Sequence, residues 1–107
     1  MPTYEEKAGG LFRKLAGDFV ARESNRTSLI TVTNVIIKEN GREALFLVTV
    51  LPESQEEIAL AFLKRKRSDL REYIKKNTRV KTIPVVDFEI DKGEKNRQRI
   101  DELSRET

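Results

Sequence analysis

The 107-residue sequence contains no cysteine, no histidine and no tryptophan. The absence of cysteine excludes disulfides and thiol chemistry, and the absence of both cysteine and histidine excludes the usual zinc sites. Without histidine, the commonest general base is missing as well. A chain free of cysteine is typical of a reducing compartment, so we expect a cytoplasmic protein.

Long apolar runs are also absent, and no stretch is apolar for long enough to cross a bilayer. The first residues lack the apolar core of a secretory signal peptide. The length fits one domain that can bury a core of its own. We therefore expect a monomer that binds no membrane, no metal, no cofactor and no small-molecule substrate.

Catalytic motifs are missing too, because there is no P-loop and no G-x-G-x-x-G segment. Pairs of acids such as Asp87 and Glu89 sit where the exposed face of a strand would put them. Ser54 and Ser68 have no histidine to activate them, and a helix-capping role explains both. The sequence therefore predicts a protein that is not an enzyme.

The apolar pattern begins with a helix in the segment 3–24, for which Thr3 and Glu6 are a candidate capping box. Segments 28–38 and 43–51 alternate as strands of a hairpin, and Asn40-Gly41 between them favours a type I′ turn. The side chains expected to face the core from the helix and first strand are Ala8, Leu11, Phe12, Leu15, Ala16, Phe19, Val20, Ile30, Val32 and Ile36.

Helical spacing returns in segment 55–76, but a straight helix there would bury Lys66 and Arg67. Two unpaired buried cations are costly, so we expect two helices joined by a kink at 64–69, with Ser68 as the N-cap of the second. The expected kink residues are Lys66, Arg67 and Ser68. The expected buried stripes are Ile58, Ala59, Phe62 and Leu63 in the first helix, and Leu70, Tyr73 and Ile74 in the second.

A third strand is expected over 79–91, at an edge or irregular at Pro84, which has no N–H to donate. The polar segment that follows has Ile100 and Leu103 at helical spacing, so we expect a short, weakly docked tail helix. The expected fold is α+β, with a three-stranded sheet covered on one face by helices. We expect one domain over 1–91 and a polar tail, partly helical or disordered, over 92–107.

Positive charge is concentrated between residues 64 and 81, which carry nine basic and two acidic residues. This segment has a net charge of +7 in a chain whose total is +3, so the rest of the chain sums to −4. Such asymmetry favours a surface that meets a polyanion, although a solvated helix face is the alternative. The candidate RNA-binding residues are Lys64, Arg65, Lys66, Arg67, Arg71, Lys75, Lys76, Arg79 and Lys81.

The order α-β-β-α-kink-α-β resembles a type II KH-like domain, although the G-x-x-G loop typical of KH domains is absent from the helix joint. Three segments resemble the ribosome-binding factor A family, which has this fold without that loop: LITVTNVIIKENGREALFLVTVLP, RVKTIPVVDFEID and RQRIDEL. Where the family has Ala-x-Gly at the kink, this chain has Lys66-Arg67-Ser68, and the glycine of the closing motif falls at Arg97.

This resemblance implies a non-enzymatic factor in ribosome biogenesis that binds the free or immature small (30S) subunit and contacts 16S rRNA. It implies a role in late rRNA processing and in growth in the cold. Two alternatives stay open: a KH-like module for another RNA, and a basic domain for an acidic protein partner. The missing G-x-x-G loop and the lack of a strand with two aromatics for base stacking count against the first alternative.

Overall fold

The chain folds with the expected α+β order in a computed structural model, which describes the backbone of residues 4–105 and the side chains of residues 7–100. The predicted capping box at Thr3 lies outside the described residues. The elements are α1 (Tyr4–Glu23), β1 (Leu29–Lys38), β2 (Glu43–Leu51), α2 (Glu56–Arg65), α3 (Arg67–Asn77), β3 (Val85–Ile90) and α4 (Lys92–Arg105), with short 3-10 turns at Glu39–Gly41 and Glu53–Gln55.

The sheet has the order β1-β2-β3, with β2 antiparallel to β1 and parallel to β3. The parallel pair requires a crossover, and α2 and α3 provide it. The third strand is an edge strand as expected, but it is shorter than predicted and begins only after Pro84. Pro84 is fully buried and has no N–H for the ladder, so residues 78–84 form a loop instead.

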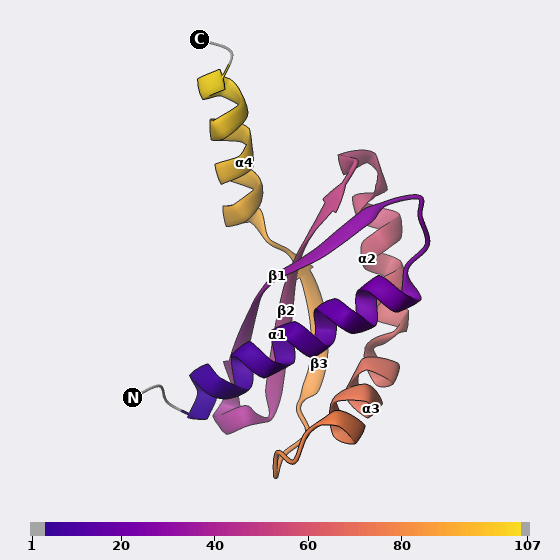
Figure 1. The fold of residues 1–107 in the computed structure, drawn as a ribbon, viewed down its shortest axis with the longest axis vertical. Helices are drawn as coiled ribbons and strands as arrows, with labels where there is room; N and C mark the ends of the chain where they lie inside the picture. Colours follow the sequence, from indigo (N-terminus) through magenta and orange to yellow (C-terminus); the bar gives the residue numbers. More distant parts are fainter. Residues whose placement is uncertain (1–3, 106–107) are drawn as a thin grey trace.

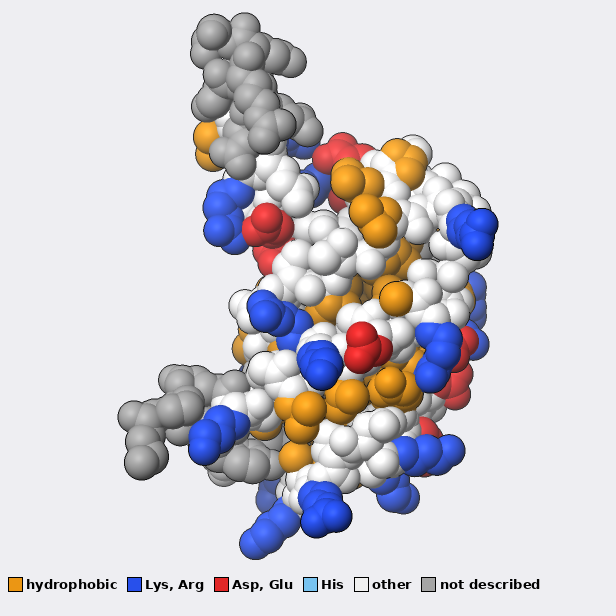
Figure 2. Space-filling model, viewed as in Figure 1, with side chains coloured by type: hydrophobic (Ala, Val, Ile, Leu, Met, Phe, Trp, Pro, Cys, Tyr) orange, Lys and Arg blue, Asp and Glu red, His pale blue; other side chains and the backbone are white. Residues whose placement is uncertain are grey.

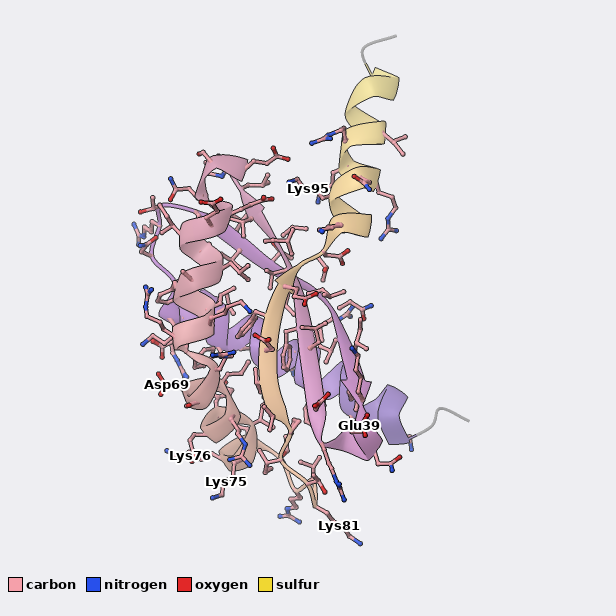
Figure 3. All side chains as sticks on the ribbon, turned by 180° about the vertical axis from the view of Figure 1, so that it is seen from behind. Glu39, Asp69, Lys75, Lys76, Lys81 and Lys95 are labelled. Atoms are coloured by element: carbon pink, nitrogen blue, oxygen red, sulfur yellow. The ribbon has the colours of Figure 1, made fainter. Side chains whose placement is uncertain are left out.

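Three helices, α1, α2 and α3, cover one face of the sheet (Figure 1). The view from behind shows the opposite face of the sheet without a helix over it (Figure 3). Within the described residues no helix is long and apolar enough to span a membrane. The core between helices and sheet is built from Phe12, Phe19, Phe46, Val48, Leu63, Leu70, Ile74 and Phe88, together with smaller apolar residues.

A β-bulge between Val32 and Asn34 reverses which side chains of β1 face the core. Beyond the bulge, Val35 and Ile37 pack on the core while Ile36 is 38% exposed, so its predicted burial is wrong. The extra residue is Thr33, whose hydroxyl lies between the Leu47 carbonyl oxygen, at 3.2 Å, and a carboxylate oxygen of Asp91. Simple alternation along the sequence does not reveal such an insertion.

The hairpin turn has the backbone that Asn40-Gly41 predicts, because both residues have positive φ and the Arg42 N–H donates to the Glu39 carbonyl. Glu39 also has a positive φ of 54°. Strand pairing therefore stops at Lys38 and Glu43, one residue pair earlier than in a two-residue hairpin. A glutamate in the left-handed region is unfavourable, since its Cβ crowds the following carbonyl.

Besides Ile36, two residues expected in the core are exposed: Leu11 of α1 by 40% and Ile58 of α2 by 65%. Helix α2 turns Ala59 and Leu63 toward the sheet, and these two are buried. Ile58 precedes Ala59 by one position, so it points about 100° away around the helix. The side chain of Ala59 is small, which lets this helix lie close to the sheet.

Helix α4 extends away from the sheet and helices (Figure 1). An Asp91 oxygen accepts the Glu94 N–H at 2.9 Å, which caps the first turn. Lys95 Nζ lies 3.1 Å from Glu56 and 3.4 Å from Glu53, and the carboxylates of Glu56 and Glu53 raise the pKa of Lys95. Farther along, Ile100 is 61% exposed. The predicted tail helix is therefore present, longer than expected, and attached mainly at its base.

Candidate nucleic-acid interface

The expected kink between the two helices is centred on Lys66, whose φ and ψ of −98° and 7° are not helical. The Lys66 N–H donates to the Leu63 carbonyl and closes α2, while the Lys66 carbonyl accepts from Leu70 N–H in the first turn of α3. Lys66 is therefore the N-cap of α3, and the predicted N-cap role of Ser68 is wrong. Leu63 and Leu70 are fully buried on either side of this polar joint.

The four consecutive cations at the joint point in different directions. Lys64 and Arg67 both approach Asp87 of β3, with nitrogen–oxygen distances of 3.0 and 3.4 Å. Lys66 points toward α1, where its ammonium lies 4.0 Å from Glu23. Arg65 lines a separate pocket beside the start of β1. The run of basic residues is thus not one patch, because its members surround the joint.

Six of the nine predicted residues lie along one side of the molecule. Lys64, Arg67 and Arg71 follow the edge of the sheet, and Arg71 Nη2 lies 3.5 Å from the carbonyl oxygen of Ile83. Lys75 is one helical turn beyond Arg71. The loop after α3 adds two more cations. We call this set the basic stripe: Lys64, Arg67, Arg71, Lys75, Arg79 and Lys81.

The lower part of the basic stripe, which lies farthest from the helix joint and consists of Lys75, Arg79 and Lys81, forms no ion pairs within the described residues. Within the described residues, Lys75, Arg79 and Lys81 have no acidic group within 4 Å. Figure 2 shows lysine and arginine side chains gathered over α3 and the loop after it, and Figure 3 shows Lys75 and Lys81 at the same end of the molecule. Lys76 lies apart from this set, in a groove between α3 and α1.

Asp87 is the one acidic group in contact with the stripe among the described residues. Partial burial by itself raises the pKa of Asp87, but the Phe88 N–H, Lys64 and Arg67 together hold that pKa below its ordinary value. Asp87 is therefore ionised at neutral pH and occupies two cations of the stripe. Sequence reasoning treated Asp87 only as an exposed strand acid, because its distance to residues 64 and 67 depends on the crossover.

The chemistry of this surface is that of charge recognition. Within the described residues no group of three or more histidine, cysteine, aspartate or glutamate side chains is placed to hold a metal ion. Cations spaced along a helix edge and a loop suit contact with successive phosphates, which fixes position without reading sequence. Lys66 and Lys76, on the α1 side, and Arg65, at the pocket, are separated from this edge.

Comparison with known proteins agrees with the fold and with the resemblance stated above. The crystal structure of ribosome-binding factor A from Thermus thermophilus has a TM-score of 0.72 to this structure at 22% identity, covering 82% of this chain and 97% of that one. A second similar structure is a Thermus thermophilus ribosome binding factor A homology model fitted into the cryo-EM map of a 30S complex. Its TM-score is 0.66 at 21% identity, over 76% of this chain and 88% of that one.

The sequence comparisons extend this likeness from fold to family. Ribosome-binding factor A of Thermodesulfovibrio yellowstonii is 32% identical to this chain over 81 residues, which are 76% of this chain and 69% of that protein. The family model described as Ribosome-binding factor A matches residues 5–104, and so runs from the first helix to the last. The chain therefore belongs to the ribosome-binding factor A family.

Proposed function

We propose that this protein is a non-enzymatic ribosome assembly factor of the cytoplasm. It binds the free or immature small (30S) ribosomal subunit, contacts 16S rRNA and assists late maturation of that RNA. Family membership supports this function, and one similar structure was fitted into a map of a 30S complex. The observation that carries the proposal for this chain is the basic stripe along α3 and the loop after it.

The stripe suits an RNA backbone for physical reasons. Each lysine or arginine that neutralises a phosphate releases condensed counterions, which favours binding and makes affinity fall with salt. The stripe combines two cations already held in place by Asp87 with a lower group that has no acidic partner within the described residues. Its lower group, containing Lys75 and Lys81, is the part most available to phosphate.

The direct test is charge reversal in the lower part of the stripe. We expect Lys75→Glu with Lys81→Glu to reduce co-sedimentation with free 30S subunits in a sucrose gradient. The slope of log K against log salt is expected to fall by about two, or one for each lost phosphate contact. Because both side chains are exposed and unpaired within the described residues, the melting temperature is expected to change little.

A matched control makes this test specific. Arg13→Glu with Lys14→Glu changes the net charge equally, on exposed positions of α1 outside the stripe. If both double variants weaken binding equally, net charge rather than the stripe drives association. If the unmodified protein does not migrate with 30S subunits, the proposed function is wrong, and binding that survives removal of RNA would favour an acidic protein partner.

A further inference from the structure

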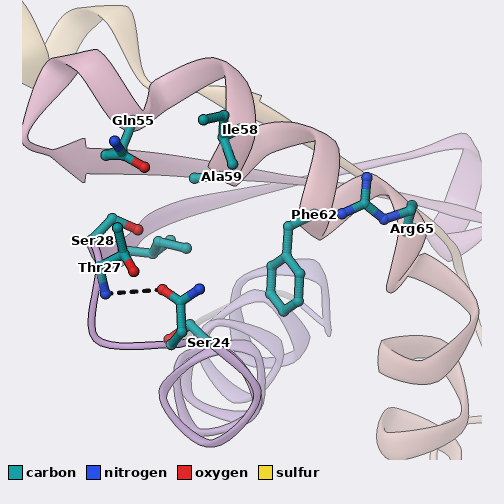
Figure 4. A pocket seen from close by; sticks show the side chains of 10 residues that line it. Ser24, Thr27, Ser28, Gln55, Ile58, Ala59, Phe62 and Arg65 are labelled. Atoms are coloured by element: carbon teal, nitrogen blue, oxygen red, sulfur yellow. Dashed lines mark hydrogen bonds between the residues drawn. The ribbon is translucent and has the colours of Figure 1, made fainter.

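A small pocket lies beside α2, on the side of the helix joint where Arg65 points (Figure 4). Its volume is about 190 Å³. The segment that links α1 to β1 forms one wall. Helix α2, together with the 3-10 turn that directly precedes it, forms the other. Drug-sized ligands occupy clefts of about 300 Å³ or more, so this one has room for a single ring system.

The wall formed by α2 presents apolar surface at the margin of the core, since Phe62 packs against the core and is only partly buried. Ala59 and Leu63 point to the sheet, whereas Ile58 and Phe62 lie one helical turn apart on the neighbouring side and line the pocket. Ile58 is 65% exposed, and the Phe62 ring extends from the helix toward the opposite wall (Figure 4). An aromatic ring beside an exposed aliphatic group forms a platform for a flat ligand.

The opposite wall carries hydrogen-bonding groups held in position by a turn. The side-chain oxygen of Asn25 accepts the Thr27 N–H at 2.9 Å, so the Asn25 amide nitrogen is left to donate elsewhere. Within the described residues that nitrogen has no hydrogen-bond partner, and neither has the side chain of Gln55 on the α2 wall. Serine and threonine hydroxyls complete this wall (Figure 4): Ser24, Thr27 and Ser28.

The charge of the lining is also selective. None of the acidic side chains that the structure describes lines this pocket. The single charged residue at the pocket is Arg65, which has no ion-pair partner within the described residues. Lys66 Nζ also lies 5.9 Å from the centroid of the Phe62 ring, but Glu23 at 4.0 Å and Asp69 at 3.7 Å already accompany its charge, so Arg65 is the cation open to a ligand. The surroundings therefore favour a ligand that combines a ring with a negative charge.

We propose that this pocket receives one unpaired nucleobase of the bound RNA. The base stacks on Phe62, its edge bonds to Asn25 and Gln55, and its phosphate meets Arg65. Unstacked bases are recognised through aromatic stacking combined with amide contacts to their edges. This inference rests on the proposed function, since it adds a base-reading site across the helix joint from a stripe that meets only phosphate. Its occupant is thus part of the same RNA.

The sharpest variant is Asn25→Asp, because aspartate keeps the oxygen that accepts the Thr27 N–H, removes the amide donors and adds a negative charge, which the control below matches. The control is Asn34→Asp, which makes the same change where an asparagine oxygen accepts the Val35 N–H at 2.9 Å outside the pocket. A second variant, Phe62→Leu, keeps apolar volume and removes the ring. Melting temperatures of all three are compared first, so that loss of binding is not confused with loss of fold.

The probes are the four nucleoside 5′-monophosphates, added to ¹⁵N-labelled full-length protein and followed by NMR. We expect saturable shifts of the Asn25 and Gln55 side-chain amides. Phe62→Leu is expected to weaken this binding about fivefold or more, as loss of base stacking does. Asn25→Asp should weaken it to a similar extent, whereas Asn34→Asp should leave it unchanged. Absence of saturable shifts, or equal effects of the two aspartates, would overturn the base pocket.

Binding to 30S subunits and to protein-free 16S rRNA separates this inference from the proposed function. If the wild type binds subunits and Asn25→Asp matches Asn34→Asp, the pocket fails while the function stands. If Asn25→Asp weakens subunit binding but neither nucleotides nor naked rRNA engage the pocket, a protein side chain occupies it and the proposal is wrong. Failure of the wild type to bind subunits counts against the proposed function, and the nucleotide titration still decides the pocket.

Discussion

Asp87 competes with RNA for two cations of the basic stripe, so removing its charge is expected to tighten RNA binding. Its carboxylate lies 3.0 Å from Lys64 Nζ and 3.4 Å from Arg67 Nη1. Both pairs are about half exposed, and such pairs are worth about 0.2–1 kcal/mol each. Freeing both cations therefore corresponds to about 0.4–2 kcal/mol, or roughly a twofold to thirtyfold gain in affinity.

The variant Asp87→Asn retains an oxygen that can accept the Phe88 N–H, a contact of 2.8 Å in the structure. We expect its melting temperature to fall slightly, because two exposed ion pairs are lost. Affinity for 16S rRNA is measured at fixed salt by filter binding, since any salt difference changes the electrostatic contribution. Glu89→Gln is the control, because it removes the same charge two residues along β3, and Glu89 has no ion pair within the described residues.

The result that refutes this reasoning is equal affinity of Asp87→Asn and Glu89→Gln. It would mean that Lys64 and Arg67 do not contact the RNA. Weaker binding by Asp87→Asn would mean that the carboxylate positions the two cations for phosphate rather than competing with it. That outcome would reverse the sign of the effect and show that preorganisation outweighs competition.

Three further predictions concern stability and the tail helix. Thr33, the Glu94 N–H and Arg97 lower the pKa of Asp91 despite the opposing effect of burial, and the pKa of Asp87 is lowered too. The ionised carboxylates of Asp91 and Asp87 therefore stabilise the fold above the unfolded pKa, near 3.9, and this stabilisation is lost as the pH falls through their folded pKa values. Urea midpoints at pH 6 and pH 2.5 measure the loss. The variant Asp91→Asn should show a smaller difference between the two midpoints. Asp91→Ala removes the cap of α4 and is expected to cost about 1 kcal/mol there, seen as faster amide exchange in α4 while β3 stays protected; unchanged exchange in α4 would contradict the capping role. Glu39→Gly relieves a positive φ and is expected to raise the free energy of unfolding by up to about 1 kcal/mol in urea, whereas lower stability would mean that the side chain makes a compensating contact.

The elements of the fold could be predicted because their local patterns agree with their final packing. Leu63 and Leu70 bracket a polar stretch that no buried helix tolerates, so the kink follows from the sequence alone. The bulge at Thr33 could not be predicted, since Thr33 and Asn34 are both polar and the sequence does not show which of them is the extra residue. Its effect on Ile36 shows how one inserted residue exchanges the faces of a strand.

The site was less predictable than the fold, for reasons of geometry. The cations at 64–67 are consecutive in the sequence, but the side chains of successive helical residues point about 100° apart. Only contacts from β3 and α1 decide that Arg67 joins the stripe and that Lys66 does not. The pocket beside Phe62 depends on two segments far apart in the sequence, 24–30 and 55–65, so no local pattern indicates it.

The bulge has a mechanical consequence for the tail. Thr33 belongs to one edge strand of the sheet, and Asp91 follows the other edge strand. Their hydrogen bond crosses over β2, and Thr33 also contacts the Leu47 carbonyl on the way. Asp91 in turn holds the first turn of α4. The base of α4 is therefore connected by hydrogen bonds to all three strands. A force that a partner applies to α4 is distributed over the whole sheet rather than over β3 alone.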